Sequence, residues 1–251
     1  MRRFQFSGLQ KVNGVLHTVT MRDPEAVLEG SMALHTGQDA EAVFRNRQSL
    51  GKYFGSDALF VSALQVHGDE VYRIKNPQSR GWESLDRRLQ ADALVTATPK
   101  VVLTILTADC VPILLCDPEA RVIAAVHAGW KGSRLGVVAK TVRTMCQEFG
   151  AEASRILAAI GPAIGGCCYE VGEEVAGAFR SIEGAVTQRE GARPRLDLKA
   201  VNRFQLLEAG LLPERIEVAS YCTACEKERF FSYRAEGGCD GRFLSAIMLK
   251  S

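Results

Sequence analysis

The chain has 251 residues, of which 47% are hydrophobic and 24% are charged, and its formal net charge is +2. These values are ordinary for a globular protein that is long enough to bury a large core. The near-neutral charge gives no reason to expect nucleic acid or an anionic membrane surface as a partner. No apolar run approaches the roughly 20 residues of a membrane span.

Two arginines near the N-terminus are not followed by an apolar segment, so we expect no signal peptide. Eight cysteines without export suggest reduced thiols and a cytoplasmic location. Because no linker, low-complexity tract or clear repeat interrupts the chain, we expect a single domain over residues 1–251. The sequence leaves the oligomeric state open.

Short β-branched runs predict strands, and amphipathic spacing between capping residues predicts helices. In the first half we expect strands at 15–20, 59–64 and 70–74, a helix at 39–54 opened by Asp39, a loop at 76–88, and an apolar segment at 91–96 that leads to a turn at Pro99. Strands at 101–106 and 122–126 follow, joined through residues 112–116 and a turn at 117–118. We then expect a helix at 133–149 begun by Ser133, a strand at 156–160, helices near 172–182 and 197–210, a flexible loop at 183–195 between them, and strands at 216–218 and 243–249.

Three of the predicted buried strands lead to a side chain of the kind that binds metals. His67 follows the strand at 59–64, Cys110 follows the strand at 101–106, and His127 closes the run at 122–126. Mixed α/β folds place their sites at the carboxyl ends of strands, so we expect the three to converge at the mouth of a cleft. Zinc binds thiolate and imidazole well, and a catalytic zinc keeps one position open beside three protein ligands. The sequence therefore predicts a zinc site.

Copper is a second candidate for this ligand set, because two histidines and a cysteine also form blue-copper sites. The chain has only two further histidines, His17 and His35. These are too few for the additional copper cluster that oxygen reduction needs, so copper is the less favoured metal.

Other residues leave alternatives open. Cys110 could be a nucleophile with His67 or His127 as its base. Asp109 could orient an imidazole or move protons, or it could be a hydrogen-bonding turn residue. Residues 222–225 form a Cys-x-x-Cys motif, and the sequence has no second one. The only candidates for the other half of a zinc site are the adjacent pair at 167–168 and the single cysteine at 239. We therefore interpret the motif as structural.

Six motifs stand out as a set, at residues 65–68, 107–112, 127–132, 160–165, 230–234 and 241–243. Together they resemble the bacterial laccase-domain (YfiH-like) family, and the resemblance extends from about residue 34 to 249. It implies an α+β fold with mixed β-sheets layered between helices, similar to the fold of cysteine hydrolases. It also implies zinc-dependent phosphorolysis of adenosine, inosine and methylthioadenosine, with deamination of adenosine as a further activity. Members have also been labelled polyphenol oxidoreductases and linked to peptidoglycan editing.

The resemblance also implies roles for individual residues. His67, Cys110 and His127 would be the zinc ligands, and zinc would activate water for deamination. Arg47 matches the active-site arginine of the family and would anchor phosphate, because a guanidinium is permanently charged and can bind bidentately. Beyond the resemblance, our own mechanistic hypothesis makes Lys131 the helper of Arg47 and Asp109 a proton donor, with a small nucleoside and phosphate as the partners.

Two N-terminal segments depart from the family pattern. A Ser/Thr-Thr-Arg/Lys-x-Gly-Gly segment aligns only with residues 20–24, which lack the glycine pair, and a Ser-Leu-Asn-x-Gly segment aligns with residues 30–34, where Ser31 replaces the asparagine. The substrate range is therefore open. The rival predictions are a hydrolase with Cys110 as nucleophile, including one that edits peptidoglycan precursors, a non-enzymatic zinc-binding protein and, less favoured, a copper-dependent polyphenol oxidoreductase.

Overall fold

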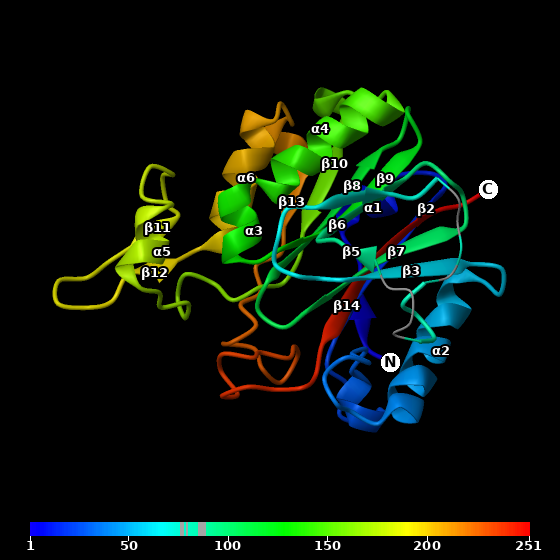
Figure 1. The fold of residues 1–251 in the computed structure, drawn as a ribbon, viewed down its shortest axis with the longest axis horizontal. Helices are drawn as coiled ribbons and strands as arrows, with labels where there is room; N and C mark the ends of the chain where they lie inside the picture. The colour runs from blue at the N-terminus through cyan, green and yellow to red at the C-terminus, as the bar shows by residue number, and fades with distance from the viewer. Residues whose placement is uncertain (76–77, 79, 85–88) are drawn as a thin grey trace.

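The computed structural model describes residues 1–75, 78, 80–84 and 89–251, and two six-stranded sheets form its centre (Figure 1). The first sheet has the order β1 (Arg3–Phe4), β2 (Val15–Thr20), β14 (Phe243–Leu249), β7 (Val101–Thr107), β3 (Leu59–Leu64) and β5 (Leu89–Gln90). The second has the order β13 (Ile216–Val218), β10 (Leu157–Ile160), β8 (Val111–Asp117), β9 (Val122–Ala128), β6 (Ala93–Thr96) and β4 (Val71–Arg73). Parallel pairs such as β3–β7 and β10–β13 lie beside antiparallel pairs such as β8–β9, so the expected α+β fold with mixed sheets is confirmed.

The alternation of side chains along each strand sorts the apolar residues into layers. In β9, Val122, Ala124 and Val126 face helices, whereas Ile123 and Ala125 face the first sheet. The helices α3 (Trp130–Leu135), α4 (Val137–Phe149) and α6 (Leu198–Glu208) lie on the outer side of the second sheet, and α2 (Ala40–Phe54) lies on the opposite side of the molecule (Figure 1). The central strands are thus buried on both faces, which is why their sequences are continuous apolar runs.

Two of the predicted helices have the expected starts. The Asp39 side chain accepts hydrogen bonds from the first turn of α2, and Asp197 does the same for α6. The predicted helix at 133–149 is wrong at its start, because α3 and α4 are separate helices. Gly136 has φ +75°, a left-handed conformation that ends α3, and Ser133 lies inside α3 rather than at a cap.

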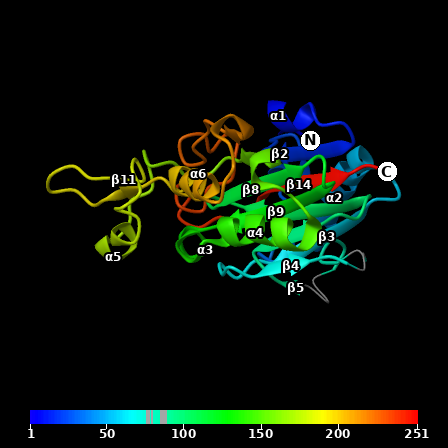
Figure 2. The same cartoon turned by 90° about the horizontal axis from the view of Figure 1, so that it is seen from above.

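Residues 161–197 differ most from the prediction. The helix expected near 172–182 is only α5 (Glu173–Gly177), and the loop expected at 183–195 contains an antiparallel ribbon of β11 (Val186–Thr187) and β12 (Arg195–Leu196). Strands of two residues are too short to leave an alternating pattern in a sequence. Together α5 and the ribbon form a projection that extends away from the sheets in both views (Figures 1 and 2).

The remaining elements are short, apart from one strand that the sequence did not predict. Residues 112–116, expected as a connection, are the centre of β8. The loop expected at 76–88 lies partly outside the described residues; within the described part, Arg80 bridges to Val61 and Trp82 stacks on Phe60. The other short elements are α1 (Ser7–Gln10) and the 3-10 turns Val27–Gly30, Ala153–Arg155 and Pro213–Arg215. Within the described residues, no helix combines the length and apolar character needed to cross a membrane.

Candidate functional site

The three predicted metal ligands come together at one end of the two sheets. The ligand atoms of His67, Cys110 and His127 all lie within 4.8 Å of one another. His67 follows β3, and Cys110 lies in the turn where the chain leaves β7 in the first sheet and enters β8 in the second. His127 is on β9 and shares the alternation of Ile123 and Ala125, so its side chain faces the space between the sheets.

The turn that carries His67 is held by a buried carboxylate. His67 has φ +61°, an uncommon conformation for a residue with a side chain. The Asp92 carboxylate accepts backbone N–H groups from Val66 at 3.3 Å, His67 at 3.0 Å and Gly68 at 2.7 Å. Three successive N–H groups around one carboxylate stabilise the left-handed turn and aim His67 toward Cys110, whose Sγ is 3.8 Å from His67 Nε2.

The same carboxylate orients the second histidine. His127 Nδ1 lies 2.8 Å from Asp92 Oδ1, and both side chains are buried. The contact makes Nδ1 the protonated nitrogen, so Nε2 is left for a ligand. Burial opposes ionisation of Asp92, but the hydrogen bond and charge of His127 and the backbone N–H groups outweigh it and hold the pKa of the carboxyl below its usual value. Sequence reasoning missed Asp92, although an acidic residue inside the apolar run 91–95 was a usable signal.

Cys110 and His127 favour each other's charged forms. Burial alone would raise the pKa of Cys110, but the charge of His127 and hydrogen bonds from both histidines lower it to about 6. Burial would likewise lower the pKa of His127, but Cys110 and Asp92 raise it to about 9. Cys110 therefore has thiolate character near neutral pH, which both a metal ligand and a nucleophile require.

Two glycines make room for this cluster. A Cβ on Gly129 would lie 3.0 Å from His67 Cδ2 and 3.1 Å from Cys110 Sγ, so a larger residue would enter the space between the ligands. A Cβ on Gly132 would lie 2.9 Å from the carbonyl oxygen of Gly68, so the glycine lets α3 pack closely on the turn that carries His67.

The donor set fits a bound metal ion. It offers two imidazoles and a thiolate from three rigid positions, with one imidazole fixed by a carboxylate as is usual for histidine ligands. The absence of a side chain at Gly129 leaves room beside His67 and Cys110. These residues are the ligands that zinc takes in catalytic sites, where a further position stays open.

The cluster opens into a cleft with a volume of about 360 Å³, within the range of small-molecule sites. His67, Cys110 and His127 line it. The other walls combine aromatic rings, cationic groups and apolar side chains, among them Trp130, Tyr169, Tyr233, Arg234, Arg242 and His35. Burial raises the pKa of Tyr169 to about 12, so its phenol stays protonated at neutral pH. From the sequence, His35 entered only the histidine count that argued against copper, and the aromatic residues of the cleft were not predicted as site residues.

Asp109 lines the cleft, and its carboxylate accepts hydrogen bonds from two other segments of the chain. Its Oδ1 accepts hydrogen bonds from the hydroxyls of Thr223 at 2.6 Å and Ser232 at 2.7 Å, and its Oδ2 accepts from the backbone N–H of Arg234 at 2.7 Å. Of the roles predicted for Asp109, the structure shows the hydrogen-bonding turn residue, at φ +89°. The carboxylate fixes the segment that carries Arg234 into the cleft.

The structure does not bring Arg47 to the cleft. Its side chain is 1% exposed and donates to the carbonyl oxygens of Met32, Gly81 and Trp82, so it joins α2 to two neighbouring segments. Arg47 is therefore buried and is not among the side chains that line the cleft, which differs from the expectation that it faces the substrate. Lys131 is exposed beside the cleft, with Nζ 5.7 Å from the centre of the Trp130 ring.

The chain is similar to known proteins over most of its length. A family model described as multi-copper polyphenol oxidoreductase laccase matches residues 24–250. The chain is 44% identical over 214 residues to a purine nucleoside phosphorylase of Deinococcus radiodurans, covering 84% of this chain and 79% of the relative. It is 36% identical over 225 residues to the purine nucleoside phosphorylase YlmD of Geobacillus stearothermophilus, covering 86% and 82%. The crystal structure of the Bacillus licheniformis hypothetical protein YfiH matches with a TM-score of 0.90 at 34% identity, covering 96% of this chain and 95% of that one.

Proposed function

The chain belongs to the multi-copper polyphenol oxidoreductase laccase family, and from this premise we propose that it is a zinc-dependent purine nucleoside phosphorylase. The reaction would convert adenosine, inosine or methylthioadenosine and phosphate to the free base and the ribose 1-phosphate. Two relatives that align with more than four fifths of the chain carry the name purine nucleoside phosphorylase, which supports the reaction class.

The observation that carries the proposal is the composition of a single cleft. His67, Cys110 and His127 lie in it together with aromatic rings and arginines. Aromatic faces stack on purine bases, and a guanidinium binds phosphate with charge and paired hydrogen bonds. A nucleoside needs the first and the phosphate co-substrate needs the second.

Zinc fits the ligands better than copper does. The four histidines of the chain include the two ligands and His35 in the cleft, while His17 is buried on β2 beside Phe6. A further copper cluster therefore has no histidine set to hold it, although the name of the family refers to copper. When bound, zinc would supply Lewis-acid polarisation of a substrate oxygen or of water.

The protein residues would position the reactants. Arg234 is the proposed phosphate anchor, in place of Arg47, because it lines the cleft and Asp109 fixes its backbone. Tyr169 keeps its phenolic proton at neutral pH, so it can donate a hydrogen bond to the substrate. Asp92 holds His127 in the tautomer that leaves Nε2 toward the cleft. The rings of Trp130 and Tyr233 would shield the base from water.

Chromatography of nucleosides incubated with the zinc-loaded protein, with and without phosphate, tests the proposal. Phosphate-dependent release of adenine, hypoxanthine or methylthioadenine is expected. We also propose deamination of adenosine in the same cleft, which would appear as inosine without phosphate. If none of the three nucleosides is consumed at any zinc loading, the phosphorylase proposal is wrong and a non-enzymatic zinc-binding role is favoured.

One observation favours a second candidate, a hydrolase with Cys110 as nucleophile. Cys110, His127 and Asp92 stand in the order of nucleophile, base and orienting acid. Such an enzyme would act on an acyl substrate, for example a peptidoglycan precursor, without metal. A covalent adduct on Cys110 in active, metal-free protein would support it, whereas loss of the cleft zinc together with activity in Cys110→Ala would support the ligand role.

A further inference from the structure

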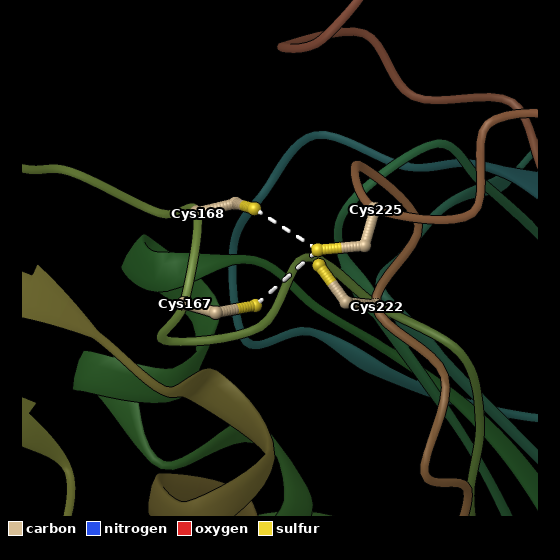
Figure 3. A group of neighbouring side chains, drawn as sticks. All are labelled: Cys167, Cys168, Cys222 and Cys225. Carbon is tan, nitrogen blue, oxygen red and sulfur yellow. Dashed lines mark hydrogen bonds between the residues drawn. The ribbon is translucent and has the colours of Figure 1, made fainter.

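A second group of side chains with metal-ligating chemistry lies outside the cleft. Cys167, Cys168, Cys222 and Cys225 meet with all four Sγ atoms within 4.8 Å of one another. Figure 3 shows two of them on one loop and two on another, with their sulfur atoms pointing to a common centre. The first loop follows β10 and the second follows β13, and these two strands pair in parallel, so the loops leave the same edge of the second sheet.

We propose that these four cysteines bind one structural zinc ion, separate from the ion proposed for the cleft. A zinc ion bound tetrahedrally at a Zn–S distance of about 2.3 Å places its sulfur atoms about 3.8 Å apart. Cys225 Sγ lies 3.7 Å from Cys167 Sγ and 3.3 Å from Cys168 Sγ. A disulfide needs about 2.05 Å, and the structure, which describes all eight cysteines, has every one of them as a free thiol. The spacing is therefore that of ligands around one ion.

The surrounding backbone is adapted to a sulfur cluster. The N–H of Gly165 donates to Cys222 Sγ at 3.2 Å, and hydrogen bonds of this kind stabilise a thiolate ligand and fix its direction. A Cβ on Gly165 would lie 3.3 Å from Cys167 Sγ and 3.4 Å from Cys222 Cβ. The glycine thus keeps the first loop close to the second.

This cluster changes the interpretation of the motif at 222–225. The sequence contains one Cys-x-x-Cys motif, at residues 222–225, and without a second one the pattern predicts a structural role. The second half of the ligand set is instead the adjacent pair Cys167 and Cys168, which the pairing of β10 with β13 brings alongside. Four thiolates in one tetrahedral set make a closed site, which is the form of structural zinc.

The ion would fasten one wall of the cleft. The first loop carries Ile164 and Tyr169 to the cleft, and the N–H of Ile164 donates to the carbonyl oxygen of Asp109. The second loop places Thr223, whose N–H donates to Ala163 and whose hydroxyl donates to Asp109. The two loops therefore meet at Asp109, next to Cys110 in the chain, and the zinc would hold them together without touching substrate.

The same ion would anchor the projection formed by α5, β11 and β12. The projection leaves the body directly after Cys168 and returns at residue 196, where the N–H of Leu196 donates to the carbonyl oxygen of Tyr169. Its buried apolar side chains form only a small set, namely Val171, Val175, Ala176, Phe179, Ala185 and Leu196. Small excursions of this kind commonly depend on a metal or disulfide for stability.

Metal content per chain tests the proposal directly. Wild-type protein should contain about two zinc ions, and Cys225→Ser and Cys168→Ser should each contain about one. Cys110→Ala should also keep about one, held by the four cysteines, and Cys146→Ser on α4 is the matched control that should keep both. We expect Cys225→Ser to melt at a lower temperature than Cys146→Ser.

A second measurement does not depend on how well the cluster variants fold. X-ray absorption at the zinc edge of Cys110→Ala should show four sulfur neighbours at about 2.3 Å and no nitrogen. The proposal is overturned if Cys110→Ala contains no zinc, if Cys225→Ser keeps the wild-type content, or if iron occupies the site. A disulfide joining two of the four cysteines in freshly purified, zinc-loaded protein would overturn it as well. None of these readouts involves nucleoside turnover, so they decide this proposal even if the proposed function fails.

Discussion

Replacing Asp92 with asparagine tests whether a buried carboxylate, and not the three ligands alone, sets the affinity of the cleft for zinc. Asparagine preserves the shape of the side chain and one acceptor oxygen. Its amide replaces the other oxygen with a donor, which would face N–H groups that Asp92 now accepts, including those of His67 and Gly68. The hydrogen bond from His127 Nδ1 would lose the charge that strengthens it.

The expected effect follows from these contacts. Loss of the carboxylate partner of a histidine ligand lowers metal affinity about 10- to 100-fold, which corresponds to about 1.4–2.7 kcal/mol. Hydrogen bonds to a charged group contribute about 1.5–3 kcal/mol each to stability, so the metal-free variant should also lose about 2–4 kcal/mol of unfolding free energy. Because the pKa of Asp92 is lowered in the fold, this contribution is present above the unfolded pKa and is lost as pH falls through the folded pKa. The comparison belongs near pH 7.5, where the carboxylate is ionised.

The assay is competition between zinc-free protein and a chelator of known affinity, in a Cys225→Ser background that removes the second proposed site. Asp117→Asn is the matched control. Asp117 is also 0% exposed and accepts backbone N–H groups from Glu119, Ala120 and Glu152, but it lies at the far end of β8 from the cluster. It should lose stability and keep the zinc affinity of the parent. The reasoning is refuted if Asp92→Asn binds zinc within twofold of the parent, or if Asp117→Asn loses affinity equally.

Three further predictions follow from individual side chains. Gly129→Ala should lower the zinc affinity of the cleft at least about tenfold, because the added Cβ would crowd two of the ligands. Gly51→Ala on α2 is the control, because its added Cβ would meet no atom within 4 Å and the affinity should stay unchanged. Equal zinc titrations of the two variants would contradict this. Burial lowers the pKa of His17 to about 4, so as the pH falls this residue is protonated in the unfolded chain before it is protonated in the fold. The free energy of unfolding, measured with urea, should therefore drop by about 2 kcal/mol between pH 7 and 5 beyond any drop in His17→Gln. Parallel pH profiles of the two proteins would contradict this. Arg47→Lys should lose about 2–4 kcal/mol of stability while the KM for phosphate stays unchanged. Arg234→Lys should raise the KM for phosphate about tenfold with little change in stability. The opposite pattern would assign the phosphate site to Arg47.

Much of the fold could be predicted because its central strands are buried on both faces. Short, continuous apolar runs such as 101–106 and 122–126 are typical of strands that are buried on both faces. Asp39 and Asp197 precede helices, and aspartate is a residue type that helix caps favour. The ligands His67, Cys110 and His127 could be found because each lies where such a run ends or turns. What the sequence pattern lacked was the break at Gly136, since a glycine inside a helical pattern is compatible with continuation.

The rest of the site depends on contacts between distant segments, which a single sequence does not record. Asp92 supports the metal site only because β6 pairs with β9 and brings it against His127. Arg47 looked like an anion ligand by its permanent charge, but its buried guanidinium donates to the carbonyl oxygens of two neighbouring segments and lies against the Trp82 ring. The two halves of the four-cysteine cluster meet only through the pairing of β10 and β13.

The placement of the cleft between the two sheets has a consequence for how the protein responds to metal supply. His67 follows β3 of the first sheet, Cys110 lies in the turn between the two sheets, and His127 belongs to the second. An ion bound by all three would fasten one sheet to the other at this seam, so unfolding would require its release. At a free concentration one hundred times the dissociation constant, such an ion adds about 2.7 kcal/mol to stability. Scarcity of the cofactor would then shorten the lifetime of the protein as well as silence it, and a cell could clear chains that never received their metal.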